Sequence, residues 1–309
     1  MKELNYDKDT KMKRGFPRIR KLGAINRNGE MTPFVHKGRL MRAELIDPSH
    51  GLNRNSQDTI VCIRDVGTNE IVSYIAEGCN YPAAYVENDV VYITTTVMGH
   101  YDTVRIFKSE DLKNWESWDL FTNPGWQYVN TGLTKGPDGY VLLLEALSPL
   151  EHVGVPYTHF FAKSSDLKHW ELLDYNKSSP KELYTGSPWF RYSNGYYYMI
   201  CLMILPYARY SNYLFRSKDL ENWEVGYYNP ILMPSEDDRL VAPSFSETDA
   251  SFLKDMKEGF ISSNSDIDMC DWQGKTYINY VAGNQRGLYY LCEAQYDGTV
   301  DEFLAANFE

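Results

Sequence analysis

Four carboxylates stand at the ends of apolar or strand-like runs, whereas most acids of this chain fall on turns. Glu145 ends the run Val141-Leu142-Leu143-Leu144. Glu44 ends the corresponding run of the first repeat, and this equivalence to Glu145 makes it a candidate as well. Asp266 and Asp268 are two residues apart, so on a strand they share a face. Burial raises the pKa of a carboxyl group toward the range of a general acid. These four acids therefore predict acid–base chemistry. The alternative is a structural ion pair for Glu145 and a salt bridge or hydrogen-bonded support for Glu44, whereas Asp266 and Asp268 need a partner, a cation or a shared proton.

The elements that position these acids are indicated by a repeated turn. Lys108–Glu116, Lys163–Glu171 and Arg216–Glu224 all carry the pattern Ser-x-Asp-Leu-x-x-Trp-Glu, with 55 and 53 residues between successive aspartates. Asp and Asn side chains satisfy local backbone groups in turns. We therefore expect a strand that ends at the Ser, a tight turn that the Leu and Trp hold against the sheet, and a new strand from the Trp.

A second unit recurs five times, as a short strand, a tight turn and a longer aromatic or aliphatic strand. Its turns are Lys37-Gly38, Asn88-Asp89, Asp138-Gly139, Asn194-Gly195 and Gln273-Gly274. Without an N-terminal arm of about 30 residues, each unit has about 56 residues, enough for a four-stranded antiparallel sheet. The sequence thus predicts an all-β fold, a five-bladed β-propeller over residues 31–309 behind a short arm, 1–30. An insertion over 233–259, with a short helix around 251–257, is expected to cover one end of the channel.

Composition excludes some functions. With a formal net charge of −11, the chain is not expected to bind nucleic acid or an anionic membrane surface, because both are negatively charged. No apolar run is long enough to span a membrane, and the N-terminus lacks the apolar core of a signal peptide, so we expect a cytoplasmic protein. The five cysteines are widely spaced and fit buried free thiols better than disulfides or zinc ligands.

The Ser-x-Asp-Leu-x-x-Trp-Glu turns, together with the Asp-Gly-Tyr-type hairpins, resemble the five-bladed β-propeller glycoside hydrolases around families 43, 62, 32, 68 and 117. The resemblance covers about 31–309 and implies hydrolysis of glycosidic bonds by carboxylates at the channel end of the innermost strands. The usual family 43 pattern places an Asp before the first blade's Pro and a Glu where the fourth blade begins. This chain has Thr32 and Ser187 there, so the usual catalytic set does not transfer.

A glycosidase needs two carboxyl groups that flank the scissile bond. Glu145 and Asp268 are the favoured pair. Asp268 is preferred to Asp266 because it lies deeper in the strand, and Asp266 and Glu44 are the further candidates. Side chains near expected loop or strand ends that could contact a sugar are Tyr81, Trp126, Tyr157, His159, Trp189 and Arg286. His159 also fits a packed strand residue, and each ring also fits ordinary packing.

No metal-ligand spacing and no nucleotide or serine-hydrolase motif is present, so no cofactor is expected. A cation held in the central channel by Asp266 or Asp268 stays open as an alternative. The sequence therefore supports two functions. One is an exo-acting glycosidase that cuts a terminal sugar from an oligosaccharide, and the other is a propeller that binds a carbohydrate or a protein after losing the chemistry.

Overall fold

Antiparallel sheets make up most of the computed structural model, which describes residues 16–46, 58–174, 184–207 and 209–308. The first four-stranded sheet contains β2 (Met31–His36), β3 (Arg39–Ile46), β4 (Ile60–Asp65) and β5 (Ile71–Ile75). The second contains β6 (Cys79–Glu87), β7 (Val90–Val97), β8 (His100–Ser109) and β9 (Glu116–Thr122). The third contains β10 (Gln127–Gly136), β11 (Gly139–Ser148), β12 (Thr158–Ser164) and β13 (Glu171–Leu172).

The remaining eight strands form one continuous sheet with two antiparallel halves. One half contains β14 (Gly186–Ser193), β15 (Tyr196–Leu205), β16 (Arg209–Ser217) and β17 (Trp223–Val225). The other contains β18 (Ser263–Trp272), β19 (Lys275–Gly283), β20 (Tyr289–Tyr296) and β1 (Arg20–Asn26). A single parallel pair, Tyr210 with Ser263, joins the halves.

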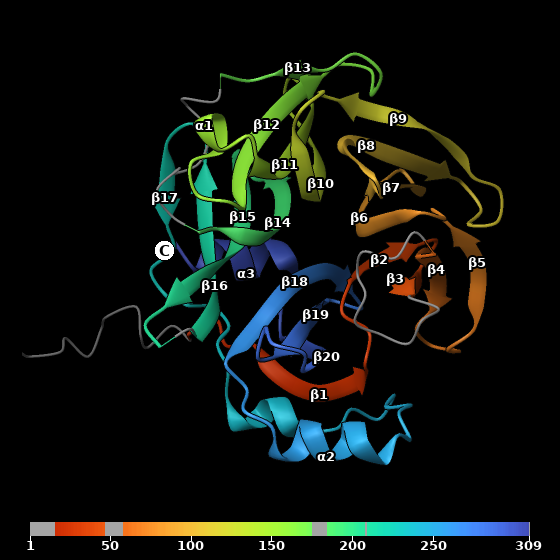
Figure 1. Ribbon diagram of the computed structural model, residues 1–309, viewed down its shortest axis with the longest axis vertical. Coiled ribbons are helices and arrows are strands. Elements are labelled where there is room, and N and C mark those ends of the chain that lie inside the picture. Colours follow the sequence, from red (N-terminus) through yellow and green to blue (C-terminus); the bar gives the residue numbers. More distant parts are fainter. Residues whose placement is uncertain (1–15, 47–57, 175–183, 208, 309) are drawn as a thin grey trace, which may run out of the picture.

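The first strands of the five repeats surround a common centre (Figure 1). Contacts run from β2 to β6, from β6 to β10, from β10 to β14, from β14 to β18, and from β18 back to β2. Apolar side chains from both faces of each sheet pack against the neighbouring sheets, so the core consists of several clusters between sheets. This arrangement brings the same end of every inner strand to one side of the molecule.

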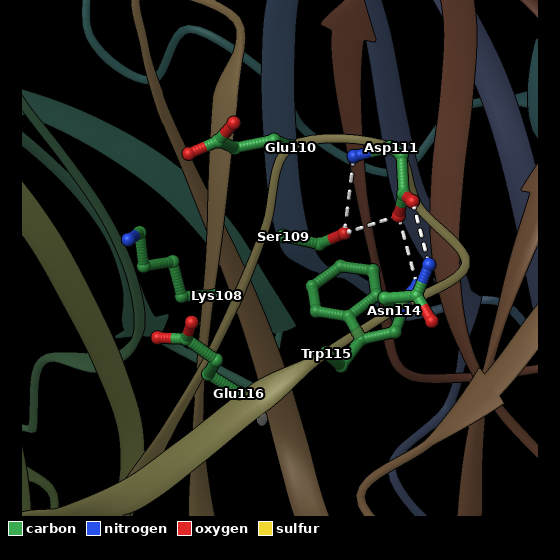
Figure 2. A pocket seen from close by; sticks show the side chains of 7 residues that line it. All are labelled: Lys108, Ser109, Glu110, Asp111, Asn114, Trp115 and Glu116. Carbon is green, nitrogen blue, oxygen red and sulfur yellow. Dashed lines mark hydrogen bonds between the residues drawn. The ribbon is translucent and has the colours of Figure 1, made fainter.

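The repeated Asp-Leu turns have the expected structure. Asp111 accepts hydrogen bonds from the backbone N–H groups of Lys113 and Asn114, both at 2.8 Å. Ser109 accepts one from Leu112 at 2.9 Å. Figure 2 shows the hydrogen bonds of Asp111 with Ser109 and Asn114. These bonds hold the pKa of Asp111 below its usual value. Leu112 is buried, and Trp115 donates to Ser73 of the preceding sheet. The turn therefore pins neighbouring sheets together, and the copies at Asp166 and Asp219 repeat its bonds.

Part of the expected N-terminal arm belongs to the last sheet, because β1 pairs antiparallel with β20. The buried Lys21 ammonium forms an ion pair of 2.6 Å with Asp238, which is fully buried and also accepts from Tyr280 at 2.9 Å. Asp238 lies in η2 (Glu236–Arg239), inside the insertion. Burial lowers the pKa of Lys21, and the Asp238 charge opposes that shift.

The insertion packs on the outer edge of the last sheet instead of covering the channel. Backbone hydrogen bonds join Ala24 of β1 to Leu240 and Ala242, and Phe252 contacts Tyr290 of β20. The expected helix is present as α2 (Ala250–Glu258), which begins at the capping residue Asp249 and lies outside β1 (Figure 1). The other helices are α1 (Leu150–Val153) and α3 (Val300–Ala306).

Two expectations from composition can be compared with the structure. All five cysteines are free thiols, and all except Cys270 are buried, as expected. In the part of the chain that the structure describes, no helix is long and apolar enough to cross a lipid bilayer.

Candidate active site

Glu145 is fully buried near the end of β11, where the alternation of the strand aims it at the neighbouring sheet. The side chains of Val141 and Leu143, on the same face, pack against β14 and β15. One carboxylate oxygen accepts from the Asn130 side chain at 2.6 Å, and the other from the Ser187 backbone N–H at 2.8 Å. The carboxyl group is therefore held by its own sheet, through Asn130, and by the neighbouring sheet, through Ser187.

Burial raises the pKa of Glu145 to about 7, although the hydrogen bonds from Asn130 and Ser187 lower it. The negative charge of Asp266 raises it further. A carboxyl group with such a pKa is largely protonated in mildly acidic solution and can give up its proton near neutrality, which is what a general acid must do.

Asp266 lies on a β-bulge, so it does not simply share a face with Asp268. In β18, Ser265 pairs with Val281 and Asp268 pairs with Asn279, which leaves Asp266 and Ile267 opposite a single residue. Asp266 has a φ of 49° and accepts a hydrogen bond from the Ser265 hydroxyl. The carboxyl group on which its charge acts is Glu145, so the structure couples Asp266 to Glu145.

Asp268 is half-buried on β18 and contacts side chains of the inner strands β2 and β14. The Met269 backbone N–H donates to it at 2.7 Å, and the side chains of Thr32 and Trp189 also donate. Burial raises its pKa to about 7 despite these bonds. Thr32, Trp189 and Asp268 each lie four residues before the end of their inner strand, so three strands contribute to one level of the channel.

Bulged residues with positive φ recur near the beginning of three inner strands. Tyr81 in β6 and Ser187 in β14 have φ values of 56° and 51°, close to that of Asp266, and all three interrupt the pairing register of their strands. Residues other than glycine rarely adopt this conformation, and it concentrates at functional sites. In β14 the bulge aims the Ser187 N–H at Glu145.

Glu44 is not brought together with the other acids. It is fully buried on β3 and forms ion pairs with Arg42 and Arg64, and the Asn28 side chain donates to it. It is five residues after Arg39, the first residue of β3, whereas Glu145 is six residues after Gly139, the first residue of β11. The two side chains therefore point to opposite faces of their sheets, which corrects their expected equivalence.

A row of tyrosines lies beside Glu145. Tyr157, 36% exposed, contacts Tyr184 with ring centroids 5.2 Å apart, and Tyr184 contacts Tyr210 at 6.0 Å. The charges of Glu145 and Asp266 both act on Tyr184. Tyr184 and Asn130 were not predicted from the sequence, although Tyr184 stands just before Gly186-Ser187, where the fourth repeat begins.

The other side chains expected to bind a sugar have different surroundings, and His159 is the cross-strand neighbour of Glu145. Trp126 is buried and stacks on Tyr128 and His152. His159 is fully buried opposite Glu145 in the β11–β12 ladder, and burial lowers its pKa to about 3, so it is neutral. Arg286 is exposed in the loop between β19 and β20.

Two surface hollows are present in the described part of the chain. A surface hollow of about 340 Å³ lies at the Asp111 turn (Figure 2), and another of about 290 Å³ lies around Trp272 and Lys275. Both lie on hairpins and turns away from Glu145. The first is lined by residues of the repeated Asp-Leu turn, which has a structural role. Among the described residues, no group of three or more His, Cys, Asp or Glu side chains is arranged to hold a metal ion.

Comparison with known proteins places the fold. No protein-family model and no curated protein sequence matches the chain. Among solved structures, the catalytic domain of the Coprinopsis cinerea GH62 alpha-L-arabinofuranosidase is 9% identical, with a TM-score of 0.59 over 92% of this chain and 98% of that one. The Bacillus subtilis arabinanase Arb43A is 12% identical, with a TM-score of 0.54 over 89% and 96%. A glycosyl hydrolase from Bacteroides ovatus is 14% identical, with a TM-score of 0.53 over 88% and 85%. The chain thus has the fold of the propeller glycoside hydrolases, as its repeated turns indicated.

Proposed function

We propose that this chain is a five-bladed β-propeller that hydrolyses a glycosidic bond at the side of the molecule where its inner strands begin. The observation that carries the proposal is Glu145, a buried carboxyl group whose pKa is near 7 and which is coupled to the charge of Asp266. Two carboxyl groups with different environments are the minimum machinery for this reaction. The shared fold with arabinofuranosidases and arabinanases supports the reaction class.

The two carboxyl groups take different roles. Glu145 supplies the proton that the leaving oxygen needs as the C–O bond breaks. Asp266, which is half-buried, activates the attacking water or stabilises the positive charge that develops on the sugar ring. Asp268 holds Thr32 and Trp189 in place one level deeper in the channel. The half-exposed ring of Tyr157 offers a surface for the C–H face of a sugar.

The test is release of a terminal sugar from a panel of aryl-glycosides and short oligosaccharides by the purified chain. Glu145→Gln and Asp266→Asn should each lower kcat by about 100-fold or more, since a positioned acid or base contributes about 10² to 10⁴ in rate. Glu116→Gln is the control, because Glu116 is exposed on β9 and should leave the rate unchanged. Undiminished hydrolysis by Glu145→Gln would refute the assignment.

A non-catalytic, carbohydrate-binding propeller is the second candidate. It is favoured by Thr32 and Ser187, which stand where the family 43 pattern has its acids. Sugar binding measured by calorimetry, with no turnover of any glycoside in the panel, would support this alternative. Binding that Glu145→Gln leaves intact would add to that support.

A further inference from the structure

The buried position of Glu145 raises the question of how its proton reaches a substrate. The side chain is 0% exposed, and hydrogen bonds from Asn130 and Ser187 hold its two oxygens. A sugar on the molecular surface cannot touch this carboxyl group directly. If Glu145 is the proton source, as proposed above, another group must carry the proton outward.

Tyr184 lies between Glu145 and the accessible aromatic surface. A Cβ atom built on Gly186 would lie 2.7 Å from the Tyr184 hydroxyl oxygen and 3.1 Å from Oε1 of Glu145. The two oxygens are therefore no more than about 6 Å apart. One water can span such a gap with two hydrogen bonds of about 2.8 Å each. Gly186 leaves open the space that this arrangement uses.

The ring of Tyr184 is held in place from both sides. Its centroid is 5.2 Å from that of the half-exposed Tyr157 and 6.0 Å from that of Tyr210. Thr185, the next residue, donates from its hydroxyl group to the Tyr157 carbonyl oxygen at 3.1 Å. A ring fixed in this way can present its hydroxyl group at a constant position beside the carboxyl groups.

We propose that Tyr184 is a catalytic residue that carries the proton from Glu145 to the leaving oxygen of a glycoside. The inference rests on the proposed glycosidase function. The Tyr184 hydroxyl group gives its proton to the glycosidic oxygen as the C–O bond breaks, and it receives the Glu145 proton through the bridging water. Asp266 takes a proton from the water that attacks the anomeric carbon. Tyr184 ends unchanged, Glu145 ionised and Asp266 protonated, and exchange with solvent restores both carboxyl groups.

The first test uses the leaving group of the substrate. Poor leaving groups need protonation, whereas an activated aryl group departs without it. Tyr184→Phe should lower kcat/KM by 100-fold or more on alkyl glycosides or oligosaccharides and by less than 10-fold on a dinitrophenyl glycoside of the same sugar. Gly186→Ala, which pushes the hydroxyl group away, should give the same pattern.

The control is Tyr85→Phe. Tyr85 is also half-buried and close to a carboxylate, Glu87, but it lies on β6 among Tyr92 and Tyr140. Its loss should change neither substrate class. If Tyr184→Phe cleaves poor leaving groups at the wild-type rate while Glu145→Gln does not, the relay is wrong and the glycosidase function stands.

The second test needs no substrate. Infrared titration of the Glu145 carboxyl band, assigned by its loss in Glu145→Gln, should show a higher pKa in Tyr184→Phe, because the hydroxyl group and its water no longer stabilise the carboxylate. An unchanged pKa would overturn the relay even in a chain that hydrolyses nothing. A shifted pKa in a chain without hydrolysis would overturn the proposed function and, with it, the transfer to substrate.

Discussion

The raised pKa of Glu145 makes the stability of the folded chain depend on pH. In the folded state this pKa is about 7, against an ordinary value of 4.5 in the unfolded chain. The folded state therefore binds the Glu145 proton more tightly, and the free energy of unfolding falls as pH rises from 4.5 to 7. The difference between a pKa of 4.5 and one of about 7 corresponds to roughly 3 kcal/mol in the free energy of unfolding. This contribution is present below pH 4.5 and is lost above pH 7.

Glu145→Gln removes this ionisation while keeping the size of the side chain. The amide cannot accept from both Asn130 and Ser187, so we expect a loss of about 1–3 kcal/mol at pH 5 from one unsatisfied hydrogen bond. At pH 8 the wild type has already lost its roughly 3 kcal/mol, so the variant should equal or exceed it in stability.

Urea unfolding at pH 5, 6, 7 and 8, followed by tryptophan fluorescence, measures the difference between the two chains. Comparison with the variant cancels the contributions of other titrating groups, including Asp268. A stability difference that stays constant from pH 5 to pH 8 would show that Glu145 has an ordinary pKa and would refute the reasoning.

Three further results are expected. Asp266→Asn removes a negative charge that acts on Glu145, so infrared titration should give a lower pKa for Glu145 than in the wild type; an unchanged value would place Asp266 too far away. Lys21→Met leaves the buried Asp238 without its cation and should lower the free energy of unfolding by about 3–5 kcal/mol in urea; a loss below 1 kcal/mol would contradict this. Asp111→Ala removes the hydrogen bonds of its turn and should lower the thermal midpoint, which calorimetry measures against the exposed control Glu116→Gln; an unchanged midpoint would mean that the turn does not hold the sheets.

Much of the fold could be predicted from the sequence, because local chemistry determines the turns. Each Asp-Leu turn contains its own hydrogen-bond donors and acceptors, so its structure follows from a few adjacent residues such as Asp111 and Asn114. The five hairpin turns are equally local, and all are present where expected. The pairing of β1 with β20 joins residues far apart in the sequence, and no local pattern encodes it.

The site was harder to predict because its geometry depends on bulges. Alternation along a regular strand predicts that Asp266 and Asp268 share a face, but one extra residue in β18 changes that relation. Ser187 has a positive φ, for which its residue type gives little warning. Glu44 shows the same sensitivity, because an offset of one position from Glu145 reverses the face.

The pairing of β1 with β20 also has a consequence for how the chain reaches its native state. Ala24 pairs with Cys292, so β1 stays without its partner strand until the chain has been synthesised through β20. Closing so long a loop costs entropy and slows folding. Before the two strands pair, β20 presents an unpaired edge to which a strand of another chain can add, so the pairing with β1 protects against aggregation.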